Sequence, residues 1–395
     1  MLEPQSTALF VLLVVVFGAL MWRGLAGGRL VVRVGVVCLA FVPAMAFGVL
    51  AVNRYYGYYQ TWGALVADLT DKGVSAADGV PRVSFGSGDE PATLDGSRGQ
   101  LIAAQRQGYL LDLMVTGPGS GLTRAVYVYL PPQYFQPAYR GYRFPAVELI
   151  HGQPGRPADW ITVVGVTAAF DRLLAAHAAR PAVLVMPDAN GGPQISLQCL
   201  NQAGGPQDLT YLAVDLPAQI TRLVRVARPG PAWGVAGYSE GGFCAANMAL
   251  RYPDRFGSAG VLSGYFTPGD NQLADGRQVS PFGGNPYLAA QNTPLTEIGA
   301  LPAGTTVPRF WLGAGAADGQ DVTAAEQFWQ ALRTRQPDAP LTLTPGGGHT
   351  MTTWRAQIPA MLTWMTTGLA QAAPQQPAAP RPNTPILAAG RPATG

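Results

Sequence analysis

Charged residues are scarce in this chain of 395 residues: they make up 12%, about half of the roughly 25% that is usual for globular proteins. The net charge is +3, and the body of the chain carries no cluster of lysine or arginine, which excludes the basic surface typical of nucleic-acid binding. Histidine and cysteine occur three times each, without the spacing of zinc or calcium ligands. We therefore expect neither a nucleic-acid partner nor a metal site.

Two long apolar runs set residues 1–54 apart from the rest of the chain. Thr7–Trp22 and Val34–Val52 are nearly continuous apolar sequence, each close to the roughly 20 residues that cross a bilayer, and three arginines stand between them. Because positive charges favour the cytoplasmic side, the pattern predicts a two-span membrane anchor with the main domain outside the cytoplasm. A cleaved signal peptide is the alternative for the first run, but its start lacks the positive charge that such peptides carry.

Residues 55–108 are typical of a juxtamembrane segment and linker. Arg54–Trp62 carries four tyrosines, and amphipathic rings gather at membrane surfaces; a tyrosine-rich core strand is the alternative. Ala64–Thr70 is amphipathic, and Ser84–Gly99 is rich in glycine, serine and aspartate, as a tether would be. At the other end, residues 371–395 are rich in alanine, proline and glutamine without periodicity, which predicts a disordered tail.

Short apolar runs alternate with helical stretches between residues 109 and 370. This alternation predicts an α/β fold: a mainly parallel, doubly wound sheet with helices on both faces, whose ligands bind beyond the carboxyl ends of the strands. The expected strands are Tyr109–Val115, Ala125–Leu130, Ala146–Ile150, Val183–Met186, Trp233–Ala236, Ser258–Leu262, Arg309–Leu312 and Leu341–Leu343. The expected helices are Val166–Ala179, Tyr211–Val226, Thr323–Thr334 and Thr353–Thr366.

The pentapeptide Gly237-Tyr-Ser-Glu-Gly241 lies between a strand-like run and an alanine-rich, helix-like run. A G-x-S-x-G motif in that context makes a sharp turn that exposes the serine above the sheet, so Ser239 is the expected nucleophile. The chain has 49 glycines, so the pentapeptide alone is weak evidence, and an ordinary glycine-rich turn is the alternative. The strand, turn and helix around it favour the nucleophile.

A serine nucleophile needs a base, which is most often a histidine oriented by a carboxylate. His349 alone among the histidines follows Ser239 in the chain, and it lies on a glycine-rich loop after the last expected strand. In the order serine, acid, histidine that α/β-hydrolases keep, His349 is the predicted base. His177 comes late on a helix, where a solvated histidine is the expected reading.

The acid of such a triad has to lie between the serine and the histidine, at the end of a strand. Asp318 and Asp321 both follow the expected strand Arg309–Leu312, in a glycine-rich turn. Asp318 comes first and is favoured. Asp321 is the alternative, and Glu326 on the following helix is the third candidate.

The oxyanion of acyl transfer needs two N–H donors, each worth on the order of 3 kcal/mol. One should be the backbone N–H of Glu240, the residue after the nucleophile. The other should come from the turn His151-Gly-Gln153, most directly from the N–H of Gln153. Two roles are equally open for the His151 side chain: it binds substrate, or it shapes this turn.

Two of the three cysteines fall in the predicted main domain. Cys199 lies in a loop and Cys244 on the helix after Ser239, and two such residues in an oxidising compartment can form a disulfide. A buried, unpaired Cys244 is the alternative, and the sequence does not separate the two.

The motifs together are similar to those of the esterase D and mycolyltransferase family, over about residues 109–367. The resemblance is carried by Leu149-Ile-His-Gly, Val185-Met-Pro-Asp188, the pentapeptide around Ser239, Gly-Gly-Gly-His349 and Trp354. It implies an α/β-hydrolase fold with serine acyl chemistry on Ser239, Asp318 and His349, and it makes His151 and Trp354 candidates for substrate binding. The trehalose mycolyltransferases carry an aspartate where His151 stands and an arginine where Pro154 stands, so the resemblance does not imply their sugar site. Their acid is a glutamate, and Asp318 is more similar to the acid of the ordinary esterase branch.

We therefore expect a membrane-anchored, extracytoplasmic serine esterase that hydrolyses acyl esters through an acyl-enzyme and needs no cofactor. An acyltransferase that moves the acyl chain to a cell-envelope sugar or lipid is the alternative. A non-catalytic envelope binding protein on a hydrolase scaffold is a third hypothesis, and the ordered serine, aspartate and histidine argue against it. The expected partners are an acyl-ester small molecule or an envelope lipid or glycolipid, and the lipid bilayer around the anchor.

Overall fold

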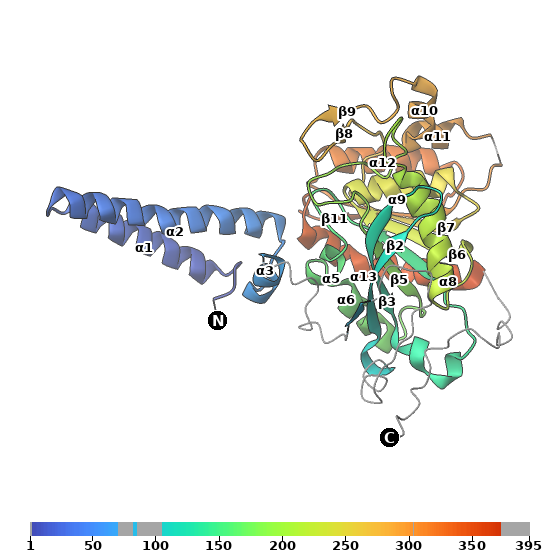
Figure 1. Cartoon of the computed structure of the whole chain (residues 1–395), viewed down its shortest axis with the longest axis horizontal. Coiled ribbons are helices and arrows are strands. Elements are labelled where there is room, and N and C mark those ends of the chain that lie inside the picture. The colour runs from blue at the N-terminus through green and yellow to red at the C-terminus, as the bar shows by residue number, and fades with distance from the viewer. Residues whose placement is uncertain (1, 70–81, 85–104, 303, 373–395) are drawn as a thin grey trace. The chain divides into compact units, whose positions relative to one another are not determined.

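The computed structural model of the chain describes residues 2–69, 82–84, 105–302 and 304–372 (Figure 1). The chain divides into two compact units, of which one holds the three N-terminal helices and the other holds the sheet and the helices around it. The tail predicted to be disordered lies outside the described residues, except for residues 371 and 372. These two residues belong to the last helix, which corrects the predicted boundary.

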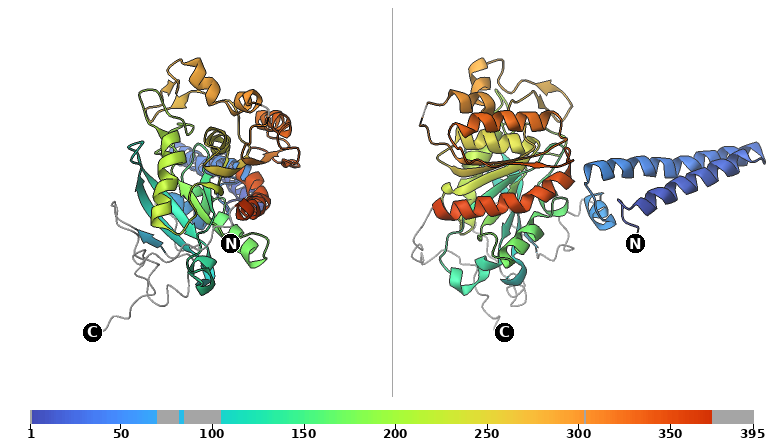
Figure 2. Two further views of the ribbon diagram at one scale, coloured as in Figure 1. Left: turned by 90° about the vertical axis from the view of Figure 1, so that its right-hand side faces the viewer. Right: turned by 180° about the vertical axis from the view of Figure 1, so that it is seen from behind.

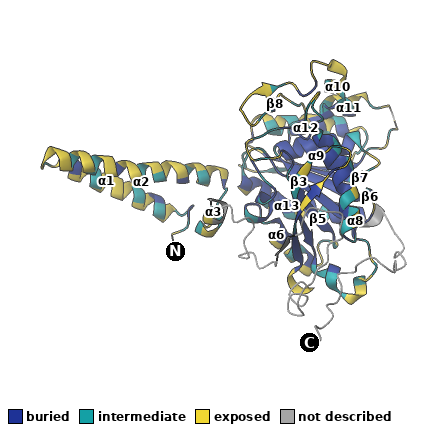
Figure 3. Cartoon of the chain, in the orientation of Figure 1, coloured by how far each residue is buried: buried dark blue, intermediate teal, exposed yellow. Residues whose placement is uncertain are grey.

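The two predicted apolar runs are helices of membrane-spanning length. Helix α1 (Thr7–Leu25) has 19 residues and α2 (Leu30–Tyr56) has 27, which corresponds to about 28 and 40 Å of helix. Where the chain turns between them, Arg33 Nε donates to the carbonyl of Gly24 at 3.0 Å. The outer faces of both helices are apolar and exposed (Figure 3), as expected of surfaces that face lipid.

The tyrosine-rich segment ends a helix and forms a turn. Tyr55 and Tyr56 complete α2, which stops at Gly57 in the left-handed conformation. The Asn53 side chain then accepts from the N–H of Tyr59 at 2.7 Å and donates to the carbonyl of Tyr59 at 2.9 Å. The alternative of a core strand is therefore wrong, and the amphipathic stretch that follows is a short helix, α3 (Trp62–Leu69).

The second unit is built on a nine-stranded sheet in the order β1-β2-β3-β5-β4-β6-β7-β10-β11. Strand β3 pairs antiparallel with β2 and β5, and all other neighbours in the sheet are parallel. The prediction of a mainly parallel, doubly wound sheet is confirmed. The strands are β1 (Arg82–Ser84), β2 (Tyr109–Thr116), β3 (Thr123–Leu130), β4 (Ala146–Ile150), β5 (Val183–Pro187), β6 (Gly230–Tyr238), β7 (Phe256–Leu262), β10 (Arg309–Gly315) and β11 (Leu341–Thr344).

Helices cover both faces of this sheet. On one face, α8 (Leu216–Leu223), α9 (Glu240–Arg251) and α12 (Gln320–Arg333) share a hydrophobic core with the strands. The other face carries α13 (Met351–Ala372), which crosses the strands in the right-hand view of Figure 2. Methionines of α13 fill the space above glycines of the central strands: Cβ atoms on Gly234 and Gly260 would lie 2.7 Å from Met365 Cε and 2.6 Å from Met361 Sδ.

Two predicted helices are shorter than expected, for local reasons. Helix α6 (Val166–Ala175) stops before His177, whose φ of 55° lies outside the helical region. The predicted helix Tyr211–Val226 begins as a π-helical turn at Tyr211–Asp215 and continues as α8 only to Leu223. Pro217 has no N–H to donate, which accounts for the interrupted hydrogen-bond ladder.

Several short elements, of two to seven residues, escaped prediction because so short a stretch carries little periodic signal. The most informative is β1, which pairs in parallel with β2 and so brings Ser84, predicted as the start of a tether, into the sheet. The rest of the predicted tether lies outside the described residues. The remaining elements are 3₁₀ turns at Pro132–Phe135 and Pro137–Tyr139, α5 (Asp159–Thr162), α7 (Asp208–Thr210), the hairpin β8 (Asn271–Gln272) with β9 (Gln278–Val279), α10 (Pro286–Gln291) and α11 (Pro294–Ala300).

Candidate active site

Ser239 stands on the turn between β6 and α9, at the carboxyl edge of the sheet. Its φ of 55° and ψ of −124° are strained for an L-residue, and close packing of glycines makes the turn possible. A Cβ on Gly237 would lie 2.1 Å from the carbonyl oxygen of Gly241, and a Cβ on Gly241 would lie 2.1 Å from that of Ile150. The glycines of the pentapeptide are thus required by the backbone, and an ordinary flexible turn does not account for them.

The structure brings the three predicted triad residues together. His349 Nε2 lies 2.8 Å from Ser239 Oγ, and His349 Nδ1 lies 3.0 Å from Asp318 Oδ1. Ser239 comes from the elbow after β6, Asp318 from the turn after β10, and His349 from the loop after β11. Three strands that end at one edge of a parallel sheet therefore bring the three candidate triad residues together.

Both candidate acids contact the same nitrogen of the base. Asp321 Oδ2 also lies 3.0 Å from His349 Nδ1. The Asp318 side chain is 1% exposed and that of Asp321 26%, so the first is enclosed and the second reaches solvent. Glu326, the third candidate, is exposed on α12. The sequence argument treated Asp318 and Asp321 as alternatives, and the structure places both at the histidine.

The charge around His349 favours the protonated ring. Burial lowers the pKa of His349, but the hydrogen bonds and charges of Asp318 and Asp321 outweigh burial and raise this pKa to about 9. Among the described residues, these three side chains also form a cluster whose ligand atoms lie within 4.8 Å of one another, close enough to hold a metal ion. Ser239 contacts Nε2, so Nδ1 is the ring nitrogen that faces the two carboxylates. Nδ1 can bind either a proton or a metal ion, and not both at once.

The turn proposed to hold the oxyanion lies directly against the nucleophile. A Cβ on Gly152 would lie 3.1 Å from Ser239 Cβ. Glu240 is the first residue of helix α9, so its backbone N–H has no hydrogen-bond partner within the helix. The assignment of the Glu240 and Gln153 N–H groups as oxyanion donors stays a prediction.

His151 is fully buried, which corrects its possible role in substrate binding. Its Nε2 accepts the N–H of Ala189 at 3.1 Å, so its Nδ1 carries the hydrogen and donates to the carbonyl of Gly152 at 2.8 Å. The ring thereby ties the end of β5 to the turn beside Ser239. Of the two roles that the sequence left open, the structure supports the shaping of the turn.

Trp354 is also buried and packs behind the base, so it does not line an open binding surface. Its ring stacks on Tyr238 at 4.7 Å and meets the His349 ring edge to face at 5.0 Å. Its indole N–H donates to Ser263 Oγ at 2.9 Å. The expected contact with substrate is corrected to a contact that orients His349.

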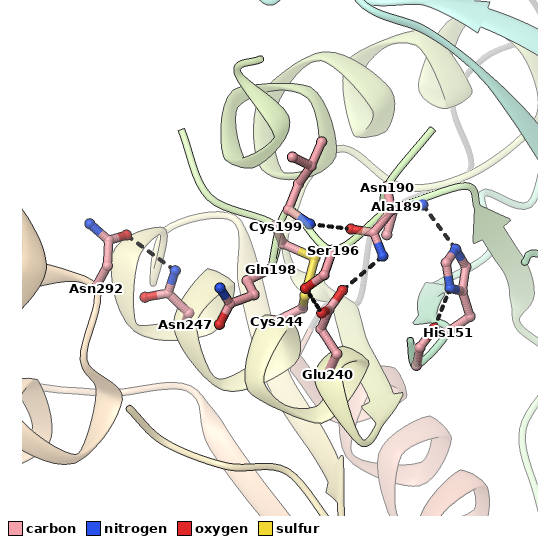
Figure 4. The surroundings of a disulfide bond; sticks show 12 residues. His151, Ala189, Asn190, Ser196, Gln198, Cys199, Glu240, Cys244, Asn247 and Asn292 are labelled. Carbon is pink, nitrogen blue, oxygen red and sulfur yellow. Dashed lines mark hydrogen bonds between the residues drawn. A yellow bond between two sulfur atoms is a disulfide. The ribbon is translucent and has the colours of Figure 1, made fainter. Parts of the chain in front are cut away.

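The side chain of Glu240 is a part of the site that sequence reasoning missed. It is buried and accepts hydrogen bonds from Asn190 Nδ2, at 2.7 Å, and from Ser196 Oγ (Figure 4). Burial raises the pKa of the Glu240 carboxyl, and these hydrogen bonds lower it in part. A carboxylate that is buried needs hydrogen-bond partners, and a glutamate directly after Ser239 in the apolar pentapeptide region was the signal in the sequence.

A disulfide between Cys199 and Cys244 joins the same loop to the same helix (Figure 4). Both residues are buried, and their bond closes a segment with a sequence separation of 45. The loop that carries Asn190 and Ser196 is therefore held to α9 both covalently and through Glu240.

Comparisons with known proteins agree with this architecture. Residues 120–365 match the family described as "Putative esterase". The match covers more than half of the chain, so the chain belongs to the esterase family, and its serine site is that of a hydrolase or acyltransferase. The predictions of an esterase-family enzyme and of an α/β-hydrolase fold are confirmed.

Individual relatives are distant. An uncharacterized protein of Corynebacterium glutamicum is 25% identical over 82% of this chain and 74% of its own length. The MPT51 antigen of Mycobacterium leprae is 27% identical over 40% of this chain and 59% of its own. Among solved structures, a ferulic acid esterase (20% identity, TM-score 0.57) and an S-formylglutathione hydrolase from Agrobacterium tumefaciens (18%, 0.54) each align with 67% of this chain and with 99% and 96% of their own, which shows the shared fold.

Proposed function

We propose that this protein is a membrane-anchored serine esterase that hydrolyses carboxylic esters through an acyl-enzyme on Ser239. The observation that carries the proposal is the continuous chain of contacts from Ser239 Oγ through both nitrogens of His349 to Asp318, at 2.8 and 3.0 Å. Such a chain turns a weakly nucleophilic hydroxyl into one that attacks an acyl carbon once the histidine ring is neutral.

The proposed reaction has two halves that use the same base. Ser239 Oγ attacks the ester carbonyl while His349 Nε2 takes its proton, and the resulting imidazolium gives that proton to the departing alcohol oxygen. Water then attacks the acyl-enzyme with His349 again as base, and the acid leaves as Ser239 regains its proton. Asp318 holds the ring and stabilises its charge in both halves. The N–H groups of Glu240 and Gln153 would hold the oxyanion.

Two features support a location at the outer face of a membrane. Helices α1 and α2 are long enough to cross a bilayer, and the three arginines between the two apolar runs favour the cytoplasmic side for that turn. The disulfide between Cys199 and Cys244 fits an oxidising compartment. We infer that the N-terminus of α1 and the C-terminus of α2 lie on the extracytoplasmic side of the membrane. The unit that contains the sheet and Ser239, called the catalytic unit below, is then extracytoplasmic as well.

Labelling with a fluorophosphonate probe tests the chemistry. We expect the full-length protein in detergent to be labelled, Ser239→Ala to lose all labelling, and Ser280→Ala, which removes an exposed serine of the β9–α10 loop, to be labelled as the wild type is. A folded wild-type protein that takes up no label would contradict every enzymatic proposal and favour the non-catalytic binding protein.

Product analysis separates the esterase from the acyltransferase. The unlabelled wild-type enzyme is given a long-chain acyl ester with and without a sugar or lipid hydroxyl acceptor. Free acid as the main product in both cases supports hydrolysis. Transfer of most of the acyl group to the acceptor would contradict it and support the alternative, in which an envelope sugar or lipid replaces water.

Protease added to intact spheroplasts tests the orientation. The catalytic unit should be digested from outside, and a cytoplasmic control protein should survive. Protection of the catalytic unit until the membrane is permeabilised would rule out the outward orientation.

A further inference from the structure

Two carboxylates converge on one hydrogen of His349. Asp318 Oδ1 and Asp321 Oδ2 each lie 3.0 Å from Nδ1, which carries a single hydrogen. The contact with Asp318 is a hydrogen bond, and Asp321 lies at the same distance as an ion-pair contact. A triad of the ordinary kind places one carboxylate at this position.

The local fold explains how both side chains reach the same atom. After β10 the chain turns at Gly319, whose φ is +57°, and α12 begins with Asp321 in its first turn. The N–H of Asp321 donates to the carbonyl of Asp318 at 3.1 Å, which holds the two residues on one tight turn. A carboxylate in the first turn also suits the positive end of the helix dipole.

The two carboxylates differ in their access to water. The Asp318 side chain is enclosed, and its Oδ2 has no hydrogen-bond partner among the described residues. Asp321 is partly exposed, so water can solvate the oxygen that does not face the ring. The exposed position lets a second negative charge lie beside the first without being buried.

Among the described residues, the ion pairs of these two aspartates are with His349 and not with an arginine or lysine. Along with burial, Asp318 and Asp321 are the causes of the raised pKa of the ring. The ring's other contacts are uncharged: the Ser239 hydroxyl at Nε2 and the Trp354 indole. Tyr265 lies near Asp321 and Glu240, and burial and both carboxylates raise its pKa well above the usual value, so it stays neutral.

We propose that Asp321 is a second positioning carboxylate of the triad, which shares the Nδ1 hydrogen of His349 with Asp318 and stabilises the imidazolium formed in each half-reaction. This inference rests on the esterase proposed above. Asp321 makes no contact with the reacting atoms itself and acts through the histidine.

Two effects on catalysis follow, with opposite signs. A second negative charge makes His349 a stronger base once it is neutral, which raises the rate at high pH. It also keeps the ring protonated, and therefore inactive as a base, over more of the pH scale. Removing Asp321 should lower the rate on the alkaline plateau and raise it on the acidic limb.

Asp321→Asn tests the proposal in the pH profile of kcat/KM for a short-chain ester. We expect the acidic limb to move down by about one pH unit and the plateau to fall several-fold. The shifted limb alone would raise activity well below it about tenfold, so the net rise there is about two- to threefold. Asp321→Glu restores a carboxylate and should move the limb back toward the wild-type position. Glu326→Gln removes an exposed charge from the same helix and should leave the profile unchanged.

Asp318 variants test the sharing itself. Removal of the only acid of a triad costs about 10⁴ in kcat. Because Asp321 remains in place, Asp318→Asn should lose only about 10², and Asp318→Asn with Asp321→Asn about 10² more. Equal activity of the single and double variants would refute sharing.

Two further results would overturn the proposal. One is an Asp321→Asn profile whose limb coincides with that of the wild type. The other is loss of wild-type activity on treatment with a chelator and its return with a divalent cation, which would make Asp321 a metal ligand. All these measurements use an enzyme whose fluorophosphonate labelling depends on Ser239. If the wild-type protein is not labelled, the proposed esterase activity is wrong. If it is labelled and the pH profiles do not change as expected, only the proposed role of Asp321 is wrong.

Discussion

Glu240 is the residue whose replacement tests most directly how the loop beside the nucleophile is held. Its carboxylate joins helix α9 to Asn190 and Ser196, and its backbone N–H is the proposed oxyanion donor. Changes of its side chain leave that N–H in place. These variants therefore test how the side chain holds the loop without removing the N–H that is proposed to bind the oxyanion.

The expected size of the effect can be worked out from the contacts. Hydrogen bonds to a charged group contribute about 1.5–3 kcal/mol each, so two of them give an upper limit of about 3–6 kcal/mol. Burial raises the pKa of this carboxyl, which means that water solvates the ion better than the protein does and that the net value is smaller. We expect Glu240→Ala to lower the free energy of unfolding by about 2–4 kcal/mol.

Glu240→Gln is the matched variant. The amide oxygen can still accept from Asn190, and the Ser196 hydroxyl can turn to accept from the amide nitrogen. The loss should therefore be about 1 kcal/mol, with kcat within a few-fold of the wild-type value. Glu326→Ala, on the exposed side of α12, is the control for removal of a carboxylate.

Urea unfolding of the full-length protein in detergent, followed by the fluorescence of its buried tryptophans, measures these differences. Esterase activity of each variant is measured on the same preparations. If Glu240→Ala were as stable as the Glu326→Ala control, the carboxylate would not hold the loop. If Glu240→Gln lost as much stability as Glu240→Ala, the side chain's shape and hydrogen bonds would not account for its role.

Three further predictions address stability and the support of the base. Replacing Cys199 and Cys244 together by serine should lower the free energy of unfolding by about 2–4 kcal/mol, because the bond closes a segment with a sequence separation of 45; a variant as stable as the wild type under oxidising conditions would contradict this. Burial raises the pKa of Glu297 to about 7, and Arg251 lowers it in part. The folded protein therefore binds more protons than the unfolded chain between about pH 4.5 and 7, and its stability falls as pH rises through that window, by about 1–2 kcal/mol after discounting for solvent. Glu297→Gln should flatten the curve of unfolding free energy against pH, and an unchanged slope would refute the assignment. Trp354→Ala should cost about 3–5 kcal/mol in urea unfolding and lower kcat, whereas Trp354→Phe keeps the stacked ring and should lose about 1 kcal/mol; equal losses would show that packing against His349 does not matter.

The parts of the fold that could be predicted are those with a repeated signal. Apolar strands such as Val183–Pro187 are buried on both sides, so they stand out in the sequence as short continuous runs, and Ala146–Ile150 does so apart from Glu148. Strand β1 and the hairpin β8–β9 have two or three residues per strand and owe their pairing to neighbours far away in the chain. No local pattern could have found them.

The chain order of a nucleophile, an acid and a base, and the length of the two N-terminal apolar runs, were determined by the sequence alone, because motif spacing and hydrophobicity are local properties. Whether a given polar residue faces substrate or packs beneath the site is a matter of tertiary contacts. Trp354 was a candidate for substrate binding and His151 had two open roles, and the burial of both side chains makes them supports of the site. Asp318 and Asp321 looked like alternatives, and only the turn at Gly319, with the loop of His349 folded against it, brought both carboxylates to one nitrogen. Those contacts join residues about 30 positions apart, and it is the packing of β10 against β11 that sets their distance.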